Sequence, residues 1–505
     1  MKDQRLKTRG DRLRSTETSR RGFFRPSSFV FGLIFVSLSG CMVGPDYEKP
    51  EVDVPAEYRF NYGQASDVAN SAWWGSFNDP LLYGLVEEAL RNNRDVRIAA
   101  ARVEEFAARV DIARSGLFPQ FGYGGDANRN KSSLDTIGGV PAGISRTNEI
   151  YNASINVGWE LDFWGKIRRS TEAARANLLA QEEARRTVIL TLVTTLAAGY
   201  LDLLSLDEQL EVARQTIKAR KDSLDLFELK FKGGVVSELE VSQIRSEYEL
   251  AAVRIPAIER QIALRENALS VLLGRNPGSI KRSPSIDLLT LPDIPAGLPS
   301  ELLERRPDIR RAEQDLISAN AQIGVAKAEY FPSISLTGLF GYASTGLSEL
   351  FDDTANLWGI GGDILGPIFT GGRLSGQLRA SEAVQRQLLQ SYLLSVQTAF
   401  REVDDALIST RKYREELAAQ GRQVDALKEY ARLAQLNYDE GQVSYIEVLD
   451  SQRRLFDSEL SYTQTQGLVY ASFVAMYKAL GGGWVNEAEA VANEVDFPPE
   501  EKDQK

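Results

Sequence analysis

The sequence contains no histidine and a single cysteine in 505 residues. Without histidine, imidazole acid–base catalysis, histidine metal ligation and a Ser-His-Asp triad are excluded. Without a second cysteine, no intrachain disulfide can form. The formal charge of −11 and the pI near 5.0 argue against nucleic acid as a partner. The mean hydropathy of −0.26 is well below that of a polytopic helical membrane protein.

Sequence motifs for enzymatic chemistry are also missing. The chain has no G-x-x-x-x-G-K-[ST] phosphate loop and no G-x-S-x-G elbow. The glycine-rich stretch from Gly359 to Gly362 is strand-like and opens no helix, so it does not fit a dinucleotide site. We therefore predict that the protein is not an enzyme and has neither a catalytic residue, a metal site nor a noncovalent cofactor.

The one cysteine, Cys41, follows a segment with the layout of an export signal. Residues 1–25 hold nine lysines or arginines, and the apolar run from Phe29 to Leu38 is too short to span a bilayer as a helix. The tetrapeptide ending at Cys41 resembles a bacterial lipobox. We predict that residues 1–40 are a lipoprotein signal peptide and that Cys41 carries a covalent lipid. The alternative is a buried cysteine acting as a small hydrophobic residue.

The residue after the cysteine bears on the membrane. Met42 stands where an aspartate would resemble an inner-membrane retention signal, so its identity favours the outer membrane. The stretch from Ser19 to Arg25 also resembles a twin-arginine export signal, although a merely basic leader explains it as well. Both export routes stay open at this point.

Pairs of similar segments recur along the chain at a nearly constant spacing, which indicates a tandem duplication. Two pairs lie 213 residues apart and two later pairs 207 apart. The pairs are Asp95 to Arg97 with Asp308 to Arg310, Phe118-Pro119 with Phe331-Pro332, Gly234 to Val241 with Gly441 to Val448, and Leu273-Gly274 with Leu480-Gly481. The predicted organisation is an anchor and equatorial segment at 41–90, a first repeat at 91–274, a linker at 275–300, a second repeat at 301–484 and an acidic disordered tail at 485–505.

Each repeat contains one stretch of period-2 alternation that predicts membrane strands. From Tyr151 to Phe163, apolar and polar residues alternate over a length that suits a tilted membrane strand. Ser333 to Tyr342 behaves similarly, and Phe121 to Arg129 and Asn356 to Ile364 are weaker candidates. Each repeat thus supplies one β-hairpin. Amphipathic hairpins on a soluble core would show the same pattern.

Long helices make up most of the rest. From Lys166 to Phe231 and from Leu374 to Tyr438 there is no proline and almost no glycine. Each stretch would form a helix of roughly 100 Å at 1.5 Å per residue. A glycine-containing turn follows each, and then a returning helix for which Ser237 or Ser444 is placed as the N-cap.

Four strands cannot close a barrel in lipid, where unpaired edges are costly. Two chains would give eight strands with a filled interior, and three would give twelve, wide enough for a pore. A lipid anchor, a shared barrel and helices of this length together suit a tube that crosses the periplasm.

Five motifs, in order along the duplicated chain, resemble the TolC-like outer membrane factor family, in its lipoprotein branch that serves tripartite RND-type efflux pumps. The resemblance covers nearly the whole mature chain. The motifs are Cys41 to Tyr47 with Pro50, Trp73-Trp74 with Phe77, Asp79, Pro80 and Leu81, Leu303 with Arg305 to Ile309, Gly441 to Arg453, and Tyr477 to Trp484.

The resemblance implies an α+β membrane protein in which three chains form a twelve-stranded β-barrel with four strands per chain. A long periplasmic α-helical barrel would continue it, with a mixed equatorial belt formed by 41–90, 275–300 and the tail. The implied function is the passive outer membrane channel of an efflux pump, carrying small toxic solutes or drugs. Its implied partners are two further copies, outer membrane lipid, a periplasmic adaptor and an inner-membrane transporter that supplies the energy.

The resemblance also implies roles for particular residues. Ile446 would form an apolar ring at the periplasmic gate, and Asp450 a ring of carboxylates with Arg453 as counter-charge. The first-repeat positions are Leu239, Gln243 and Ser246, so Asp450 has no acidic twin. The alternative is that Asp450 and Arg453 form an ordinary surface pair. The hairpin tips would contact the adaptor or serve only as turns and caps, through Gly234, Val236, Ser237, Gly441, Val443 and Ser444.

Three functional hypotheses follow. The favoured one is the efflux conduit. A second is a related conduit for a protein secretion system. The third is a coiled-coil envelope lipoprotein without a channel, which would have no need of period-2 strands.

Overall fold

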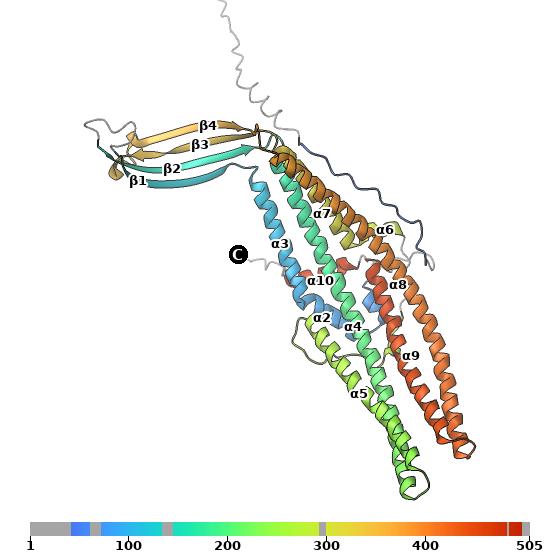
Figure 1. Ribbon diagram of the computed structural model, residues 1–505. Coiled ribbons are helices and arrows are strands. Elements are labelled where there is room, and N and C mark those ends of the chain that lie inside the picture. The colour runs from blue at the N-terminus through green and yellow to red at the C-terminus, as the bar shows by residue number, and fades with distance from the viewer. Residues whose placement is uncertain (1–41, 61–71, 134–144, 292–298, 482–483, 497–505) are drawn as a thin grey trace, which may run out of the picture.

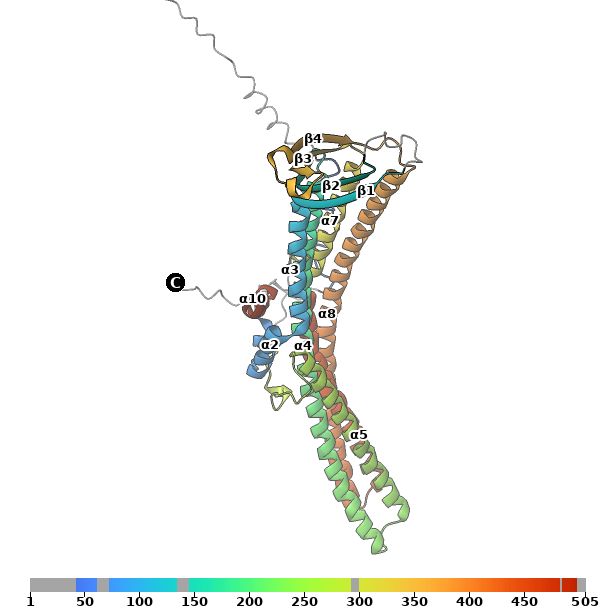
Figure 2. The same ribbon diagram turned by 90° about the vertical axis from the view of Figure 1, so that its left-hand side faces the viewer.

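The computed structural model describes residues 42–60, 72–133, 145–291, 299–481 and 484–496. The molecule is elongated, with a β-sheet at one end and two helical hairpins at the other (Figures 1 and 2). The predicted signal peptide, Cys41 and the centre of the predicted linker lie outside the described residues.

The first half of the chain runs from the middle of the molecule to the sheet and then back along the whole length to the tip of the first hairpin. From the tip it returns toward the middle. Its elements are η2 (Trp73–Phe77), α2 (Pro80–Asn92), α3 (Arg94–Ser115), β1 (Gln120–Lys131), β2 (Thr147–Leu161), α4 (Lys166–Lys232), α5 (Glu238–Leu272) and η3 (Ile286–Leu288).

The second half repeats this order. Its elements are α6 (Pro299–Arg305), α7 (Pro307–Ala328), β3 (Ser333–Ser344), η4 (Leu347–Glu349), η5 (Asp353–Ala355), β4 (Asn356–Leu365), α8 (Arg373–Asp439), α9 (Tyr445–Ala479) and α10 (Val485–Asp496). Helices α4 and α8 each have 67 residues, and α5 and α9 each have 35. The structure thus confirms the two long helices and their returning partners.

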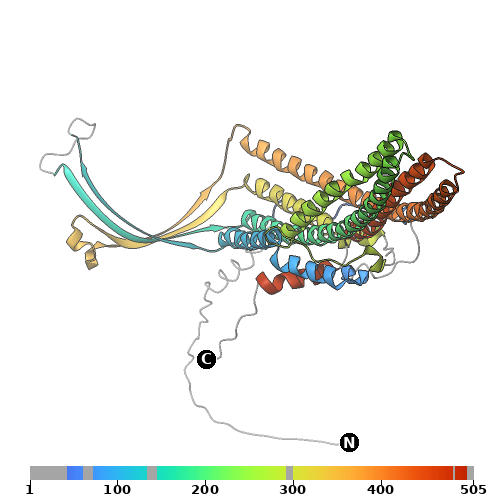
Figure 3. The same cartoon turned by 90° about the horizontal axis from the view of Figure 1, so that it is seen from below.

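The four predicted strands form one antiparallel sheet in the order β1-β2-β3-β4. The two repeats meet at β2 and β3, where Ile155 lies opposite Phe340. Figure 3 shows the strands curving together along their length. Strands β1 and β4 each have one edge without a partner strand in the described part of the chain. Strand β2 has 15 residues and is longer at its start than predicted, because Thr147 to Ile150 pair with the end of β1.

The two faces of the sheet differ in polarity. One face carries a row of apolar side chains that stay exposed in the single chain: Phe121, Tyr123, Ile155, Leu336, Phe340, Trp358, Ile360 and Ile364. The other face presents mostly glycines and polar residues, together with Leu339 and Leu365; the glycines and polar residues include Gly122, Asn152, Ser154, Asn156, Glu160, Thr337 and Asp363. This is the alternation of a membrane strand with one side toward lipid and one toward water.

The long helices bury their apolar stripes against one another. Helix α4 packs against α3, α5, α7 and α9, and α8 packs against α7 and α9. In the uncharged stretch of α4, Ile189, Val193 and Leu196 are completely buried in this core, whereas Thr191 and Thr195 are exposed. By length and composition α4 is apolar enough to cross a membrane, but its apolar window is mostly covered by protein. It is therefore a core helix.

A belt of aromatic residues ties the start of the chain to its end. Trp73 stacks on Tyr477 with ring centroids 5.0 Å apart, and Trp484 meets both Trp73 and Trp74 edge-on. Nearby, Asp79 caps α2 and also accepts hydrogen bonds from Tyr200 and Ser283. The belt joins segments from both repeats.

The prediction of a disordered tail was wrong for Val485 to Asp496, which form α10 and pack on α2 and α4. Val485, Ala488 and Ala492 are buried at helical spacing, and Glu489 accepts a hydrogen bond of 3.1 Å from Arg186. The acidic composition of this segment favoured disorder, and its apolar stripe of three residues is too narrow to outweigh that signal in the sequence. Residues 497–505 lie outside the described part.

Candidate functional site: the hairpin tips and the gate helix

Both helical hairpins end at the same end of the molecule, away from the sheet (Figures 1 and 2). Their turns have the same backbone, with Gly234 at φ +74° and Gly441 at φ +77°. A side chain at either glycine would meet no atom within 4 Å, so the left-handed conformation alone requires glycine there. Predicted tip residues Gly234, Ser237, Gly441 and Ser444 are exposed, whereas Val236 and Val443 are half-buried.

The two returning helices begin differently. Ser237 forms a complete capping box with Glu240 at the start of α5. Ser444 occupies the N-cap position of α9, but its side chain makes no capping hydrogen bond. Glu447, the counterpart of Glu240, instead accepts a hydrogen bond from the Tyr430 hydroxyl on α8. The predicted capping role is thus confirmed for Ser237 and wrong for the Ser444 side chain.

A small apolar core holds the two hairpins together just above the turns. We call it the tip cluster. Its centre is Phe227 of α4, whose ring lies 4.3 Å from Tyr445 of α9 between centroids. Its buried members are Leu224, Phe227, Val241, Ile244, Ala434, Tyr445, Val448 and Leu449, with Val236 packed against them. Each hairpin therefore depends on the other for its apolar packing.

Of the predicted gate residues on α9, Ile446 is level with this cluster, and Asp450 and Arg453 follow directly after it. Ile446 is exposed, and Asp450 follows one turn later on the same side of the helix. Arg453 Nη2 lies 2.6 Å from Asp450 Oδ1, so the predicted pair forms. Arg454 Nε also lies 2.8 Å from Asp450 Oδ2. Asp450 thus has two positive neighbours, and Arg454 was missed although its i+4 spacing signals it.

On the matching face of α5, the position equivalent to Asp450 carries no acid. Leu239 is exposed like its counterpart Ile446, whereas Gln243 and Ser246 stand in place of Asp450 and Arg453. Val235, at the outermost turn, is 75% exposed and was not among the predicted contacts. The structure therefore keeps an apolar position on both hairpins and places the charge of the predicted gate on one.

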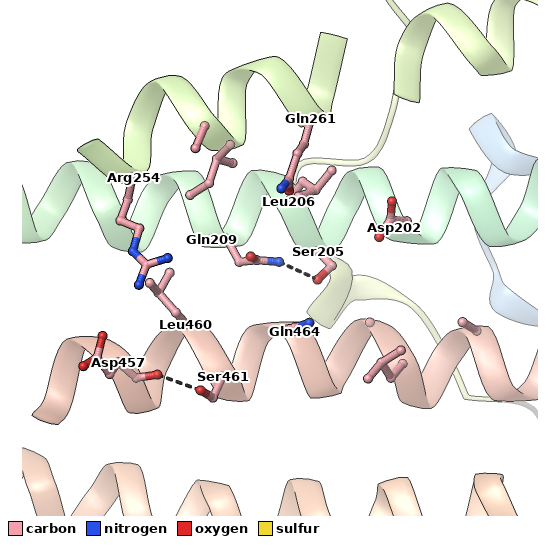
Figure 4. Close-up of a pocket in the computed structure, with 15 residues that line it drawn as sticks. Asp202, Ser205, Leu206, Gln209, Arg254, Gln261, Asp457, Leu460, Ser461 and Gln464 are labelled. Atoms are coloured by element: carbon pink, nitrogen blue, oxygen red, sulfur yellow. Dashed lines mark hydrogen bonds between the residues drawn. The ribbon is translucent and has the colours of Figure 1, made fainter. Parts of the chain in front are cut away.

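Above the gate region, α4, α5 and α9 enclose a polar groove of about 490 Å³ (Figure 4). Asp457, Ser461 and Gln464 line its α9 wall and continue the helix face of Asp450 at spacings of three and four. Arg254 and Gln261 line the α5 wall. At the base of the groove Ser205 donates a hydrogen bond of 3.0 Å to the carbonyl of Thr463, joining α4 to α9.

At the opposite end of the molecule, residues 42–58 form an extended strap along α7 (Figure 1). The strap begins where β2 joins α4, with the Val43 N–H donating to the Trp164 carbonyl. Arg169 pairs with Asp46 at 2.7 Å. A side chain on Gly44 would lie 2.5 Å from the Gly324 Cα, so the strap crosses α7 in close backbone contact. The residue after Cys41 is therefore held at the junction of sheet and helices.

Among the described residues, no group of three or more histidine, cysteine, aspartate or glutamate side chains is placed to hold a metal ion.

Comparison with known proteins identifies the fold. The family described as "Outer membrane efflux protein" matches residues 85–275 and 298–482. The toluene efflux pump outer membrane protein TtgF of Pseudomonas putida is 37% identical over 463 residues, covering 89% of this chain and 96% of the relative. The cation efflux system protein CusC of Escherichia coli is 34% identical over 457 residues, covering 89% and 97%.

Among solved structures, the outer-membrane channel OprN matches with a TM-score of 0.81 and 31% identity, over 88% of this chain and all of that one. These likenesses confirm the predicted fold class, the outer membrane location and the efflux function, and their names favour efflux over protein secretion. The relatives are transport proteins rather than enzymes. The chain belongs to the outer membrane efflux protein family, channels of Gram-negative bacteria that extend into the periplasm.

Proposed function

We propose that three copies of this chain form one passive conduit, anchored by a lipid on Cys41 and closed at the periplasmic end by the α9 face that carries Ile446 and Asp450. The observation that carries the proposal is one sheet with two edges unpaired in the described residues, joined to two helices, α4 and α8, of roughly 100 Å each. A single copy would leave those edges unpaired in lipid.

Closure follows from the direction of the edge strands. Strands β1 and β4 run antiparallel within the sheet, so β1 of one copy can pair with β4 of the next by rotation alone. Two copies give eight strands, whose interior side chains fill, and three give twelve around a water-filled lumen. The polar, glycine-rich face of the sheet would line that lumen, and the apolar face would meet lipid.

The gate proposal rests on the position and charge of Asp450. Three carboxylates near one axis repel each other, and Arg453 and Arg454 supply compensating charge within each copy. The ring favours cations over anions in the lumen, while Ile446 adds an apolar constriction next to it.

The lipid anchor is supported by the strap. Met42 lies against Gly165 at the N-terminus of α4. A lipid on Cys41 would therefore start at the end of the sheet that joins the helices, where the barrel would leave the membrane. An acyl chain there inserts without pulling the strap from α7. A second anchoring element is needed for stable attachment, and the barrel supplies it.

The exposed tips are the proposed contacts for a periplasmic adaptor, which would link the conduit to an inner-membrane transporter. Gly234, Ser237, Gly441 and Ser444 are accessible there, and Val235 adds an apolar contact. The transported class is small toxic solutes or drugs, chosen by the transporter rather than by the conduit.

The test is conductance across a planar lipid bilayer, with the wild-type protein beside Asp450→Ala and Gln243→Ala. We expect a small wild-type conductance that rises severalfold in Asp450→Ala and stays unchanged in the Gln243 control. If neither wild type nor variants conduct although they are folded and trimeric, the conduit is refuted. If all three conduct equally, the gate lies elsewhere.

A further inference from the structure

A buried arginine, Arg220, connects the first hairpin to the gate helix. It lies on α4 between α5 and α9, and its side chain is 4% exposed. Its Nη1 donates to the main-chain carbonyl of Glu247 on α5 and lies 3.2 Å from the Glu247 carboxylate. Its guanidinium lies over the Phe456 ring of α9, 5.2 Å from the centroid. One side chain thus contacts all three helices.

Simple stability does not explain this placement. Burying an arginine is costly, and its burial lowers the pKa of Arg220, an effect that the negative charges of Glu247 and Asp457 oppose. Within the described residues, the buried Nη2 of Arg220 has no hydrogen-bond acceptor. The matching position of the second repeat, 207 residues later, holds Leu427, which is only half-buried in the single chain.

The contact on α9 is close to the gate. Phe456 and Asp457 follow Arg453 within one helical turn, and Asp457 continues the face of Asp450 into the groove. Helix α9 is rigid over such a distance, so fixing Phe456 against the first hairpin also fixes the direction of the Asp450 side chain.

We propose that Arg220 is a positioning residue for the gate, holding α9 against the first hairpin so that Asp450 stays on the channel axis. The inference rests on the proposed gate. Opening requires α9 to slide from the guanidinium, and an apolar side chain at position 220 would let it slide more readily because it removes the cation–π contact and the directional bond to α5.

The experiment compares Arg220→Leu, which copies the second repeat, with Arg214→Leu. Arg214 also joins α4 to α5, but through an exposed ion pair with Glu259 at 3.1 Å. Bilayer conductance and thermal stability of the trimer are measured for both, beside wild type and Asp450→Ala. We expect Arg220→Leu to raise conductance severalfold and Arg214→Leu to leave it unchanged.

Stable Arg220→Leu trimers with wild-type conductance would overturn the inference and leave Arg220 as packing. If these trimers do not form, Arg220→Met keeps an unbranched side chain of similar length but removes the charge and the hydrogen-bond donors, and wild-type conductance of stable Arg220→Met trimers would overturn the inference equally.

The double variant Arg220→Leu/Asp450→Ala should conduct no more than the larger of the two single effects, because both act on one gate. Fully additive effects would contradict a shared gate. Failure of Asp450→Ala alone to open the channel would count against the proposed gate, whereas failure of Arg220→Leu alone would count only against the positioning role.

Discussion

The two helical hairpins share one backbone and use charge differently. In the first, Arg220 is buried against Glu247, and position 243 is a neutral glutamine. In the second, Leu427 replaces that arginine and Arg454 replaces Glu247. Arg454 turns instead to the acid at position 450, which replaces the glutamine. The duplicated backbone thus sets where the turns lie. The substitutions give the first hairpin a buried ion pair and the second hairpin a charged face on α9.

The large aromatic residues of the tip cluster are complementary rather than repeated, whereas Val241 and Val448 are buried at matching positions. The first hairpin contributes Phe227, and the second has buried Ala434 at the matching position. The second contributes Tyr445, and the first has exposed Glu238 there. One large ring from each side fills the space that the other leaves, so neither hairpin carries a complete core.

The largest difference between the hairpins is expected at the gate position, where Asp450 of the second hairpin matches Gln243 of the first. Asp450→Ala should change bilayer conductance severalfold and Gln243→Ala should not, because only the former removes charge from the constriction. An equal effect of both would mean that the hairpins contribute alike and that the charge asymmetry has no part in closure.

The largest stability difference is expected at the tip cluster. Tyr445→Ala removes a buried ring that contacts Phe227 and Tyr438 and should cost about 3 kcal/mol, as other buried aromatic residues do. Glu238→Ala, at the matching exposed position, should cost less than about 1 kcal/mol. Thermal unfolding in detergent measures both, and similar losses would show that the hairpins do not depend on Tyr445.

The caps should differ by a smaller amount. Ser237→Ala removes a complete capping box and should cost about 1 kcal/mol. Ser444→Ala should cost no more than a few tenths of that, because the Ser444 side chain makes no capping bond. Equal losses in thermal unfolding would contradict the asymmetry between the two caps.

The smallest expected effect is that of Tyr430→Phe, which tests why the two caps differ. Tyr430→Phe frees Glu447 to cap α9 as Glu240 caps α5, so its net cost should stay within about 0.5 kcal/mol. In the Tyr430→Phe background, Ser444→Ala should then become more costly than in the wild type. A double-mutant cycle with no coupling would show that Tyr430 does not hold Glu447 away.

Period and composition were enough to predict the long helices and the four strands. Helix α4 begins at the predicted Lys166 and extends one residue beyond Phe231. These elements are set by local periodicity and by glycine and proline, which a single sequence displays. The pair of Asp450 with Arg453 was predictable for the same reason, since both lie on one helix.

What the sequence did not predict depends on contacts between distant segments. Helix α10 forms because α2 and α4 cover its narrow apolar stripe, and its acidic composition alone favoured disorder. Glu447 bonds to Tyr430 on another helix, which removes it from the cap that its repeat counterpart makes. Arg220 looked like any charged residue on a long helix until α5 and α9 enclosed it.

The shared turn backbone at Gly234 and Gly441 also has a consequence for symmetry. In the proposed trimer the tips would form a ring that is nearly sixfold in backbone shape but only threefold in charge. A partner that recognises the glycine turns alone would find equivalent places all around the ring. A partner that recognises the carboxylates of α9 would bind at only every second position of the ring. The number of partner copies bound per trimer would therefore show which feature the partner recognises.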